Sequence, residues 1–166
     1  MEQAVMSKLT CAVITLSDRA SQGIYTDQST AVACDILTAN GHTVCETLLL
    51  PDDTDQLVTH LHRLCDQLDV NLILTTGGTG LSPRDITPEA TLSLAHRQVP
   101  GIGEALRAFS LTITPHAMLS RGVAVIRNQT LIVNLPGSPK AVGEILTYAL
   151  PSLVHGIGTL LGREDG

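Results

Sequence analysis

The chain has 166 residues, which predicts one domain that spans residues 1–166 and buries a substantial core. Aromatic residues make up only 2% and charged residues 16%, against about 25% charged residues in an average domain. The core must therefore be aliphatic, and we expect further copies of the chain to cover part of its surface. A net charge of −6 with no run of Lys or Arg argues against a nucleic-acid or anionic-membrane surface.

The first half of the chain alternates between apolar β-branched segments and helical patterns. Leu9–Leu16 reads as a buried strand, and Thr30–Asn40 as a helix that the Asn40-Gly41 pair ends. The next elements are strand Thr43–Leu50, amphipathic helix Thr54–Leu68 and strand Val70–Thr76. The last of these is almost wholly apolar, which is typical of a central parallel strand.

The second half continues this alternation. Thr87 is the expected N-cap of a helix that begins at Pro88 and ends at Pro100-Gly101. The remaining predicted elements are a helix over Gly103–Ile113, strands Val123–Arg127 and Thr130–Leu135 joined as a hairpin, a helix over Pro139–Ala149 that Ser138-Pro139 caps, and a last helix after Pro151. The pattern predicts an α/β fold with a mostly parallel sheet and one antiparallel strand.

Targeting and redox features are sparse. No apolar segment of signal-peptide type opens the chain, and Pro151 and two glycines interrupt the uncharged stretch Ile145–Leu161. The four cysteines show no metal-binding spacing. We therefore expect a cytoplasmic protein with buried free thiols and no membrane span.

Polar residues follow the predicted strands at one edge of the sheet, where α/β proteins bind ligands. The segments that reach this rim are residues 17–21, 51–53, 77–85, 120–122 and 136–140. Gly77–Gly80 exposes backbone N–H groups that suit phosphate, although a tight turn before a helix is the alternative. Arg19, Arg84 and Arg121 are candidate phosphate clamps.

Carboxylates also gather on this rim. Asp18, Asp27, Asp52, Asp53 and Asp85 would repel each other and any phosphate unless a hard cation such as Mg²⁺ neutralised them. The alternative is that they are solvated turn residues, which we favour for Asp27 and Asp53. Lys140 falls in the first turn of its helix, where a cation is disfavoured, and therefore hints at an anionic ligand.

Four blocks of sequence stand out at the predicted rim: Ser17-Asp18-Arg19-Ala20-Ser21, TTGGTGLSPRDITPEAT at Thr75–Thr91, LSRG at Leu119–Gly122 and NLPGSPK at Asn134–Lys140. In order and spacing, these blocks resemble the bacterial Mog-type molybdopterin adenylyltransferases of the MoaB/Mog family. The resemblance implies a trimeric three-layer α/β/α fold of molybdopterin-binding type. It also implies AMP transfer from Mg-ATP to the terminal phosphate of molybdopterin, in molybdenum cofactor biosynthesis.

By motif position, the resemblance places the essential, metal-holding acids at Asp52 and Asp85, with Mg²⁺ as cofactor and ATP as co-substrate. Further residues are predicted to bind the substrates, because they lie at the predicted rim or in the blocks that resemble the family. They are Ser17, Asp18, Arg19, Thr76, Gly77, Gly78, Thr79, Gly80, Arg84, Ser120, Arg121, Asn134, Pro136, Gly137, Ser138 and Lys140. Which of these loops takes ATP and which takes the pterin stays open. Thr30 departs from the glycine that is common in the family, and no role is assigned to it.

Three other functions compete with this one. The first is a MoaB-like pterin-binding protein without transferase activity, although Arg84-Asp85 is retained here. The second is the molybdate-insertion enzyme, which is a much longer protein but a candidate partner to receive the product. The third is a pyrophosphatase that acts on another nucleotide.

Overall fold

A six-stranded sheet forms the centre of the molecule in the computed structural model, which describes residues 7–163. The strands are β1 (Thr10–Leu16), β2 (Thr43–Leu50), β3 (Leu72–Thr76), β4 (Arg97–Gln98), β5 (Ala124–Arg127) and β6 (Thr130–Leu135). Their order across the sheet is β2-β1-β3-β6-β5-β4. Only β5 runs against its neighbours, so the predicted mostly parallel sheet with one antiparallel strand is confirmed.

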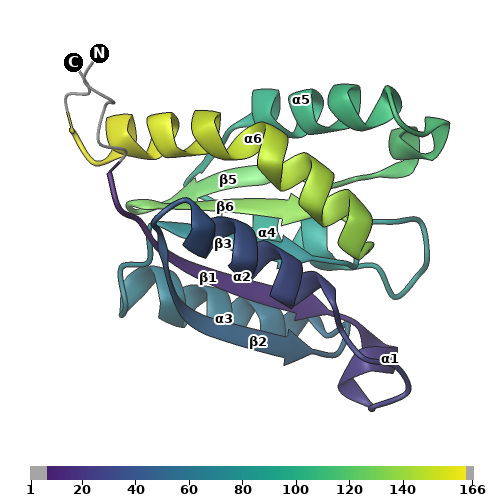
Figure 1. The fold of residues 1–166 in the computed structure, drawn as a ribbon. Helices are drawn as coiled ribbons and strands as arrows, with labels where there is room; N and C mark the ends of the chain where they lie inside the picture. The colour runs from purple at the N-terminus through teal and green to yellow at the C-terminus, as the bar shows by residue number, and fades with distance from the viewer. Residues whose placement is uncertain (1–6, 164–166) are drawn as a thin grey trace.

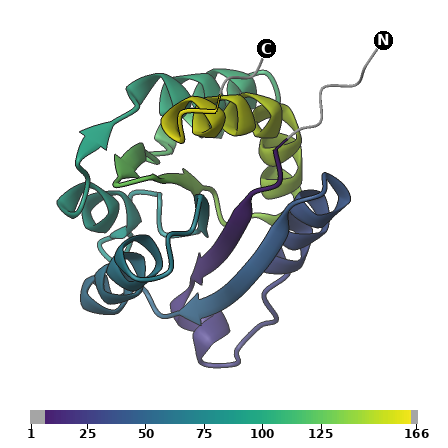
Figure 2. The same cartoon turned by 90° about the vertical axis from the view of Figure 1, so that its left-hand side faces the viewer.

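Helices cover both faces of this sheet (Figures 1 and 2). One face packs against α2 (Ser29–Ala39), α5 (Pro100–Leu111) and α6 (Pro139–Leu160), through an aliphatic cluster that includes Leu37, Leu106 and Leu146. The other face packs against α3 (Thr54–Asp66) and α4 (Thr87–Ser93). The three-layer α/β/α arrangement is therefore confirmed, and its core is aliphatic as the composition requires.

The segment around Pro151 differs from the prediction. We expected two helices separated by this proline, but α6 continues through it. Pro151 lies on the exposed side, while Leu150 and Leu153 beside it are buried, so packing outweighs the loss of one helical hydrogen bond. Figure 1 shows that the helix bends along its length, as an interior proline requires.

The segment between α4 and α5 also differs. The predicted helix from Thr87 to Pro100 ends at Ser93, and Arg97–Gln98 instead forms the edge strand β4. Backbone N–H groups of His96 and Val99 donate to β5, so long-range pairing replaces the last helical turns. Pro100 begins α5 rather than ending a helix, which suits its missing N–H group.

Two short elements had no sequence prediction, namely α1 (Asp18–Ser21) and the 3₁₀-helix η1 (Pro115–Leu119). Both belong to the edge of the sheet described below. Among residues 7–163, no helix has the length and apolar character that crossing a bilayer requires. The four cysteines are free thiols, as predicted, but only Cys11 and Cys65 are buried, whereas Cys34 is half-buried and Cys45, on strand β2, is exposed.

Candidate functional site

Four parallel strands end side by side, and the loops after them form one rim. Backbone hydrogen bonds join neighbouring loops, with Ser17 N–H donating to Leu50 O at 2.9 Å and Gly77 N–H donating to Leu135 O at 3.1 Å. Residues 120–122, which precede β5, join the same rim, because Arg121 N–H donates to Thr79 O at 2.9 Å. The predicted convergence of five polar segments is thus present in the structure.

The glycine loop (residues 77–80) requires glycine at two positions. Gly77 and Gly78 have φ angles of +86° and +69°, in the left-handed region that favours glycine. A Cβ atom on Gly77 would meet Leu16 O at 2.4 Å, and one on Gly78 would meet Thr87 Oγ1 at 2.2 Å. The loop is therefore pressed against the neighbouring backbone and α4, which leaves its backbone groups rather than side chains at the rim.

Thr87, at the start of α4, holds the glycine loop in place through two hydrogen bonds. It is not the N-cap that the sequence predicts, because Ile86 occupies that position and Thr87 is the first helical residue. Its buried hydroxyl instead donates to Gly77 O at 3.0 Å, and its N–H donates to Gly78 O. The threonine thus ties the start of α4 to the turn of the loop.

An acidic corner, made by Asp18, Asp52, Arg84 and Asp85, lies beside the glycine loop. Asp18 and Asp52 each accept a hydrogen bond from the backbone N–H of the other, at 2.9 and 3.1 Å. Both carboxylate oxygens of Asp18 also accept from the guanidinium of Arg84, at 3.0 Å each. This paired hydrogen bonding lowers the pKa of Asp18 below its ordinary value.

Asp52 differs from its neighbour. Its Oδ1 atom is buried and has no hydrogen-bond partner among the described residues. A Cβ atom on Gly78 would lie 3.1 Å from this oxygen, which places it against the glycine loop. Burial, with further repulsion from Asp18 and Asp85, raises the pKa of Asp52 above its ordinary value. A buried carboxylate oxygen without a donor is unfavourable unless a cation or donor from a ligand completes it.

Asp85 lies at the other end of the glycine loop. Its Oδ2 accepts from Ser82 N–H at 3.0 Å, and a Cβ atom on Gly80 would lie 2.9 Å from it. Within residues 7–163, no cluster of three or more His, Cys, Asp or Glu side chains is arranged to hold a metal ion. The donor set of two carboxylates, one with an open oxygen, fits Mg²⁺ that takes its remaining ligands from phosphates and water.

The predicted phosphate clamps have different surroundings. Arg121 holds the rim together, because its guanidinium donates to Gly80 O and Asp85 O at 2.8 Å each and pairs with Glu89. Arg84 is paired with Asp18, as described above, while Arg19 is exposed. Lys140 is 82% exposed and lies 3.8 Å from Glu144, a geometry equally expected of a solvated lysine.

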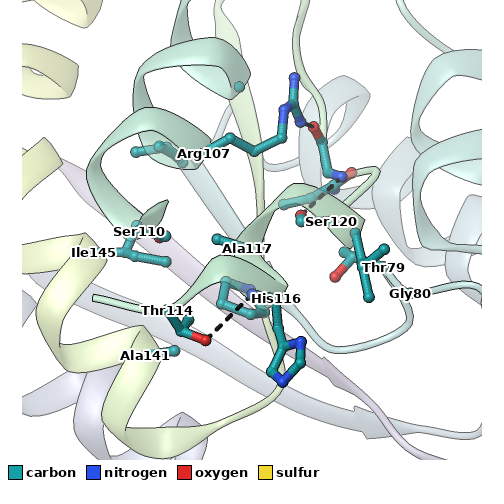
Figure 3. Close-up of a pocket in the computed structure, with 16 residues that line it drawn as sticks. Thr79, Gly80, Arg107, Ser110, Thr114, His116, Ala117, Ser120, Ala141 and Ile145 are labelled. Atoms are coloured by element: carbon teal, nitrogen blue, oxygen red, sulfur yellow. Dashed lines mark hydrogen bonds between the residues drawn. The ribbon is translucent and has the colours of Figure 1, made fainter. Parts of the chain in front are cut away.

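A cavity of about 280 Å³ opens between the glycine loop, α5 and η1 (Figure 3), and its lining includes Thr79 and Gly80 but not Asp52. Figure 3 shows Ser110 and Ile145 on one side of it, with Thr79, Gly80 and Ser120 on the other. The lining surface is mainly apolar, and its polar side chains are those of Thr79, Arg107, Ser110, Thr114, His116, Ser120 and Asn134. Such a space suits a flat heterocyclic group with a few polar edges.

Arg107 and the segment Thr114–Ala117 were missed by the sequence predictions. Arg107 is half-buried in α5, and its Nη1 donates to Gly122 O at 2.7 Å. Gly122 N–H in turn donates to Ser120 Oγ at 3.3 Å. The sequence offered one indication, a cationic residue on the inward side of an apolar helix. Only the packing of α5 shows that Arg107 contacts the loop at Gly122.

Other predicted residues are engaged by the protein itself. The amide of Asn134 accepts from Val123 N–H and donates to the hydroxyls of Thr75 and Thr91, which positions the strand below the rim. Ser17 and Ser138 are the N-caps of α1 and α6. Thr76 is fully buried, while Pro136 borders the cavity and Gly137 is exposed.

Asp27 and Asp53 stabilise helix starts, as the turn-residue interpretation expects. Asp53 is the N-cap of α3 and accepts from Gln56 N–H at 2.9 Å. Asp27 accepts from Ser29 N–H at 2.9 Å and from the hydroxyl of Thr30 at 2.5 Å. The rim carboxylates thus divide into capping groups and the acidic corner.

Comparison with known proteins gives a consistent result. Residues 12–155 match the family model described as a probable molybdopterin binding domain. The chain is 44% identical to molybdopterin adenylyltransferase of Escherichia coli K12 over 158 residues, covering 92% of this chain and 81% of the relative. It is 40% identical to the Helicobacter pylori (strain ATCC 700392 / 26695) protein of the same name over 167 residues, covering 95% and 91%.

The fold is also shared with solved structures. The molybdopterin biosynthesis enzyme MoaB from Thermus thermophilus superposes with a TM-score of 0.89 and 40% identity. The match covers 95% of this chain and 99% of that one. The arrangement of strands and rim loops is therefore one that occurs in proteins of molybdopterin biosynthesis.

Proposed function

The chain belongs to the family of molybdopterin-binding domains, and we propose that it is a nucleotidyltransferase that moves AMP from Mg-ATP to the terminal phosphate of molybdopterin. The products are adenylylated molybdopterin and pyrophosphate, within molybdenum cofactor biosynthesis. The observation that carries this proposal is the buried, unpartnered Oδ1 of Asp52 beside the glycine loop.

The acidic corner faces the phosphates. Asp52 and Asp85 would hold the Mg²⁺ ion, which supplies neutralisation of phosphate charge when it is bound. The paired Asp18 and Arg84 keep Asp52 in place, because Asp18 bonds to the backbone of Asp52 and Arg84 fixes Asp18. This chain of contacts fixes the acid before any substrate arrives, so little reorganisation accompanies the reaction.

The rim then aligns two anions that would otherwise repel each other. A terminal phosphate oxygen of molybdopterin attacks the α-phosphorus of ATP, a new P–O bond forms, and the bond to the β-phosphate breaks. The electron pair of that bond leaves with pyrophosphate. Backbone N–H groups of residues 78–80 and the start of α6 face the phosphates, whereas the N–H of Gly77 is bonded to Leu135 O. Arg84 and Lys140 balance charge on the transferring and leaving groups.

The cavity between α5 and η1 takes the heterocycle of one of the two substrates. Polar side chains in its mainly apolar lining, among them Thr79, Ser120 and Arg107, can bind the polar edges of such a group. Ser120 is on the cavity side of the rim and Asp52 is on the corner side. The bound substrate therefore extends over the glycine loop, with its heterocycle in the cavity and its phosphates at the acidic corner.

The exposed apolar side chains and the free cysteines support proposals about the oligomeric state and the cellular compartment. We propose one domain over residues 1–166 that assembles as a homotrimer, since large apolar side chains such as Leu81 and Met118 are each 66% exposed. Four free cysteines are consistent with a reducing cytoplasm. Transfer of the product to a molybdate-insertion protein completes the proposed route.

The test is a direct product assay. Purified protein is mixed with molybdopterin and Mg-ATP, and adenylylated pterin and pyrophosphate are quantified. We expect both products in equal amounts, and none after chelation of the metal. Molybdopterin that stays bound without product would instead favour a non-catalytic binding protein.

The matched variant is Asp85→Asn, which preserves shape and the hydrogen bond from Ser82 N–H. We expect it to lose turnover by at least about 10²-fold, with an unchanged melting temperature. Near-normal turnover in this variant would remove the metal role assigned to Asp85. Release of pyrophosphate from ATP in the absence of molybdopterin would favour a pyrophosphatase.

A further inference from the structure

A chain of threonine hydroxyl groups, buried at Thr15 and Thr76 and half-buried at Thr30, runs beneath the rim on the α2 face of the sheet. Thr30 Oγ1 lies 2.5 Å from Asp27 Oδ2, Thr15 Oγ1 lies 2.7 Å from Thr30 Oγ1, and Thr76 Oγ1 lies 3.0 Å from Thr15 Oγ1. Thr15 and Thr76 are 3% and 0% exposed, so water cannot replace these contacts. The chain joins the start of α2 to the residue that precedes the glycine loop.

The direction of these hydrogen bonds is fixed by the carboxylate. An ionised Asp accepts only, so Thr30 must donate its single proton to Asp27. Thr30 Oγ1 then accepts from Thr15, and Thr15 accepts from Thr76. Each hydroxyl has one partner on each side except the last, and the three threonines are held in one arrangement rather than several.

A second contact links the same helix start to the loop at 136–138. Ser29 is 3% exposed, and its Oγ donates to Gly137 O at 2.7 Å. Asp27 orders Ser29 as well, because it accepts from Ser29 N–H. The two loops are pressed together, since a Cβ atom on Gly137 would lie 3.3 Å from Gly77 Cα.

We propose that Asp27 and Thr30 position the glycine loop and the 136–138 loop relative to each other, so that Thr30 is a positioning residue for the transfer step. The inference rests on the proposed function for the identity of that step. Thr30 touches neither substrate. It acts by fixing Thr15 and Thr76 below one loop, while its neighbour Ser29 holds the other.

The position of the two loops determines how the phosphates align. A displacement of about 1 Å at reacting groups lowers rates by about 10²-fold, so a looser rim is expected to reduce kcat more than it raises KM. Thr30→Val keeps the shape of the side chain and removes its hydroxyl. It leaves the buried Thr15 hydroxyl without its acceptor, which disturbs the chain at its centre.

The experiment compares four variants with the wild type, measuring kcat, KM for ATP and for molybdopterin, and melting temperature. For Thr30→Val we expect about a tenfold loss of kcat with KM changed by less than about threefold. Thr30→Ser retains the hydroxyl and should restore kcat. Thr38→Val, the same change at an exposed position of α2, is the matched control and should behave as wild type.

Asp27→Asn separates positioning from direct chemistry. The side-chain oxygen of Asn still accepts from Ser29 N–H, and its amide group donates to Thr30, so the bond to Thr30 reverses and lengthens by a few tenths of an ångström while both contacts are kept. We expect kcat within about threefold of wild type, because the shape of the rim is preserved. A loss as large as that of Thr30→Val would mean that the Asp27 charge itself is needed, against the proposal.

Amide hydrogen exchange gives a readout that needs no turnover. Thr30→Val should accelerate exchange at residues 77–80 and 136–138, and Thr38→Val should leave it unchanged. If the wild type forms no adenylylated product, the proposed function fails while this measurement still tests the positioning role. Unchanged exchange in both loops, or a Thr30→Val enzyme with kcat within about twofold of wild type, would overturn the inference.

Discussion

Two aspartates at opposite edges of the sheet have contrasting surroundings. Asp66, at the end of α3, accepts from Arg127 at 2.8 and 2.9 Å and from Asn128 at 2.8 Å, and lies 3.3 Å from a ring nitrogen of His62. Hydrogen bonding by Arg127 lowers the pKa of Asp66 to about 2. Asp52, at the rim, keeps one buried oxygen without a partner, and its pKa is raised.

The comparison separates a structural carboxylate from one reserved for a ligand. The Asp66 cluster ties α3 to the β5–β6 hairpin, and its donors are all supplied by the protein. At the rim the protein supplies donors to Asp18 and leaves Asp52 incomplete. We therefore expect changes at the Asp66 edge to affect stability and changes at the rim to affect activity.

The largest difference in activity and stability is expected between alanine variants of two glycines that have left-handed backbone conformations. Gly78→Ala places a Cβ 2.2 Å from Thr87 Oγ1, whereas Gly41, at the opposite edge, has nothing within 4 Å of that position. Gly78→Ala should reduce kcat/KM by more than about 10²-fold and the free energy of unfolding by about 3 kcal/mol. Gly41→Ala should lose only about 1–2 kcal/mol and retain activity.

These values are obtained from chemical denaturation and from pyrophosphate release. Equal losses of activity in the two variants would show that the rim is no more sensitive to backbone strain than the far edge. That result would weaken the separation of the two edges.

A smaller difference in stability and activity is expected between alanine variants of Arg84, at the rim, and Arg127, beside Asp66. Arg84 has a 65% exposed side chain, so Arg84→Ala should leave the free energy of unfolding almost unchanged. It releases Asp18, and with it Asp52, so kcat/KM should fall by about tenfold. Arg127 is 16% exposed and also donates to Leu94 O, so Arg127→Ala should lose about 1–3 kcal/mol without loss of activity.

Both variants are measured in the same denaturation and turnover assays. An Arg127→Ala enzyme that is stable but inactive would contradict the assignment of its edge as structural.

The smallest effect is a pH dependence of stability. The folded-state pKa of Asp66, about 2, is below the ordinary value of 3.8, so its stabilising effect is present above about pH 4 and is lost as pH falls toward 2. Melting temperatures from about pH 5 to pH 2 should fall more steeply for the wild type than for Asp66→Asn. Parallel curves would show that Asp66 contributes nothing specific to the fold.

Much of the fold was predictable from local patterns. Thr130–Leu135 has the predicted bounds, and the Asn40-Gly41 stop is present, with a φ angle of +84° at Gly41. These features depend on β-branched runs and on turn chemistry. The edge strand β4 was not predictable in this way, because two exposed residues, Arg97 and Gln98, become a strand only through pairing with β5.

The site was predictable in outline and not in detail. Strand ends and the glycine run located the rim, because parallel strands bring their carboxyl ends together. The sequence does not show that Asp66 is fully paired and Asp52 is not, since Arg127 and Asn128, which donate to Asp66, are 61 and 62 residues away along the chain. The cavity depends on the packing of α5 over η1, which contacts distant in sequence determine.

The most direct test compares Asp52→Asn with Asp66→Asn in one assay of pyrophosphate release from Mg-ATP and molybdopterin. We predict that Asp52→Asn loses at least about 10²-fold in turnover while its melting temperature is unchanged or higher, because a buried charge is removed. Asp66→Asn should turn over within about twofold of wild type at neutral pH. An Asp52→Asn protein that forms adenylylated molybdopterin at the wild-type rate would contradict the assignment of this edge as the transfer site.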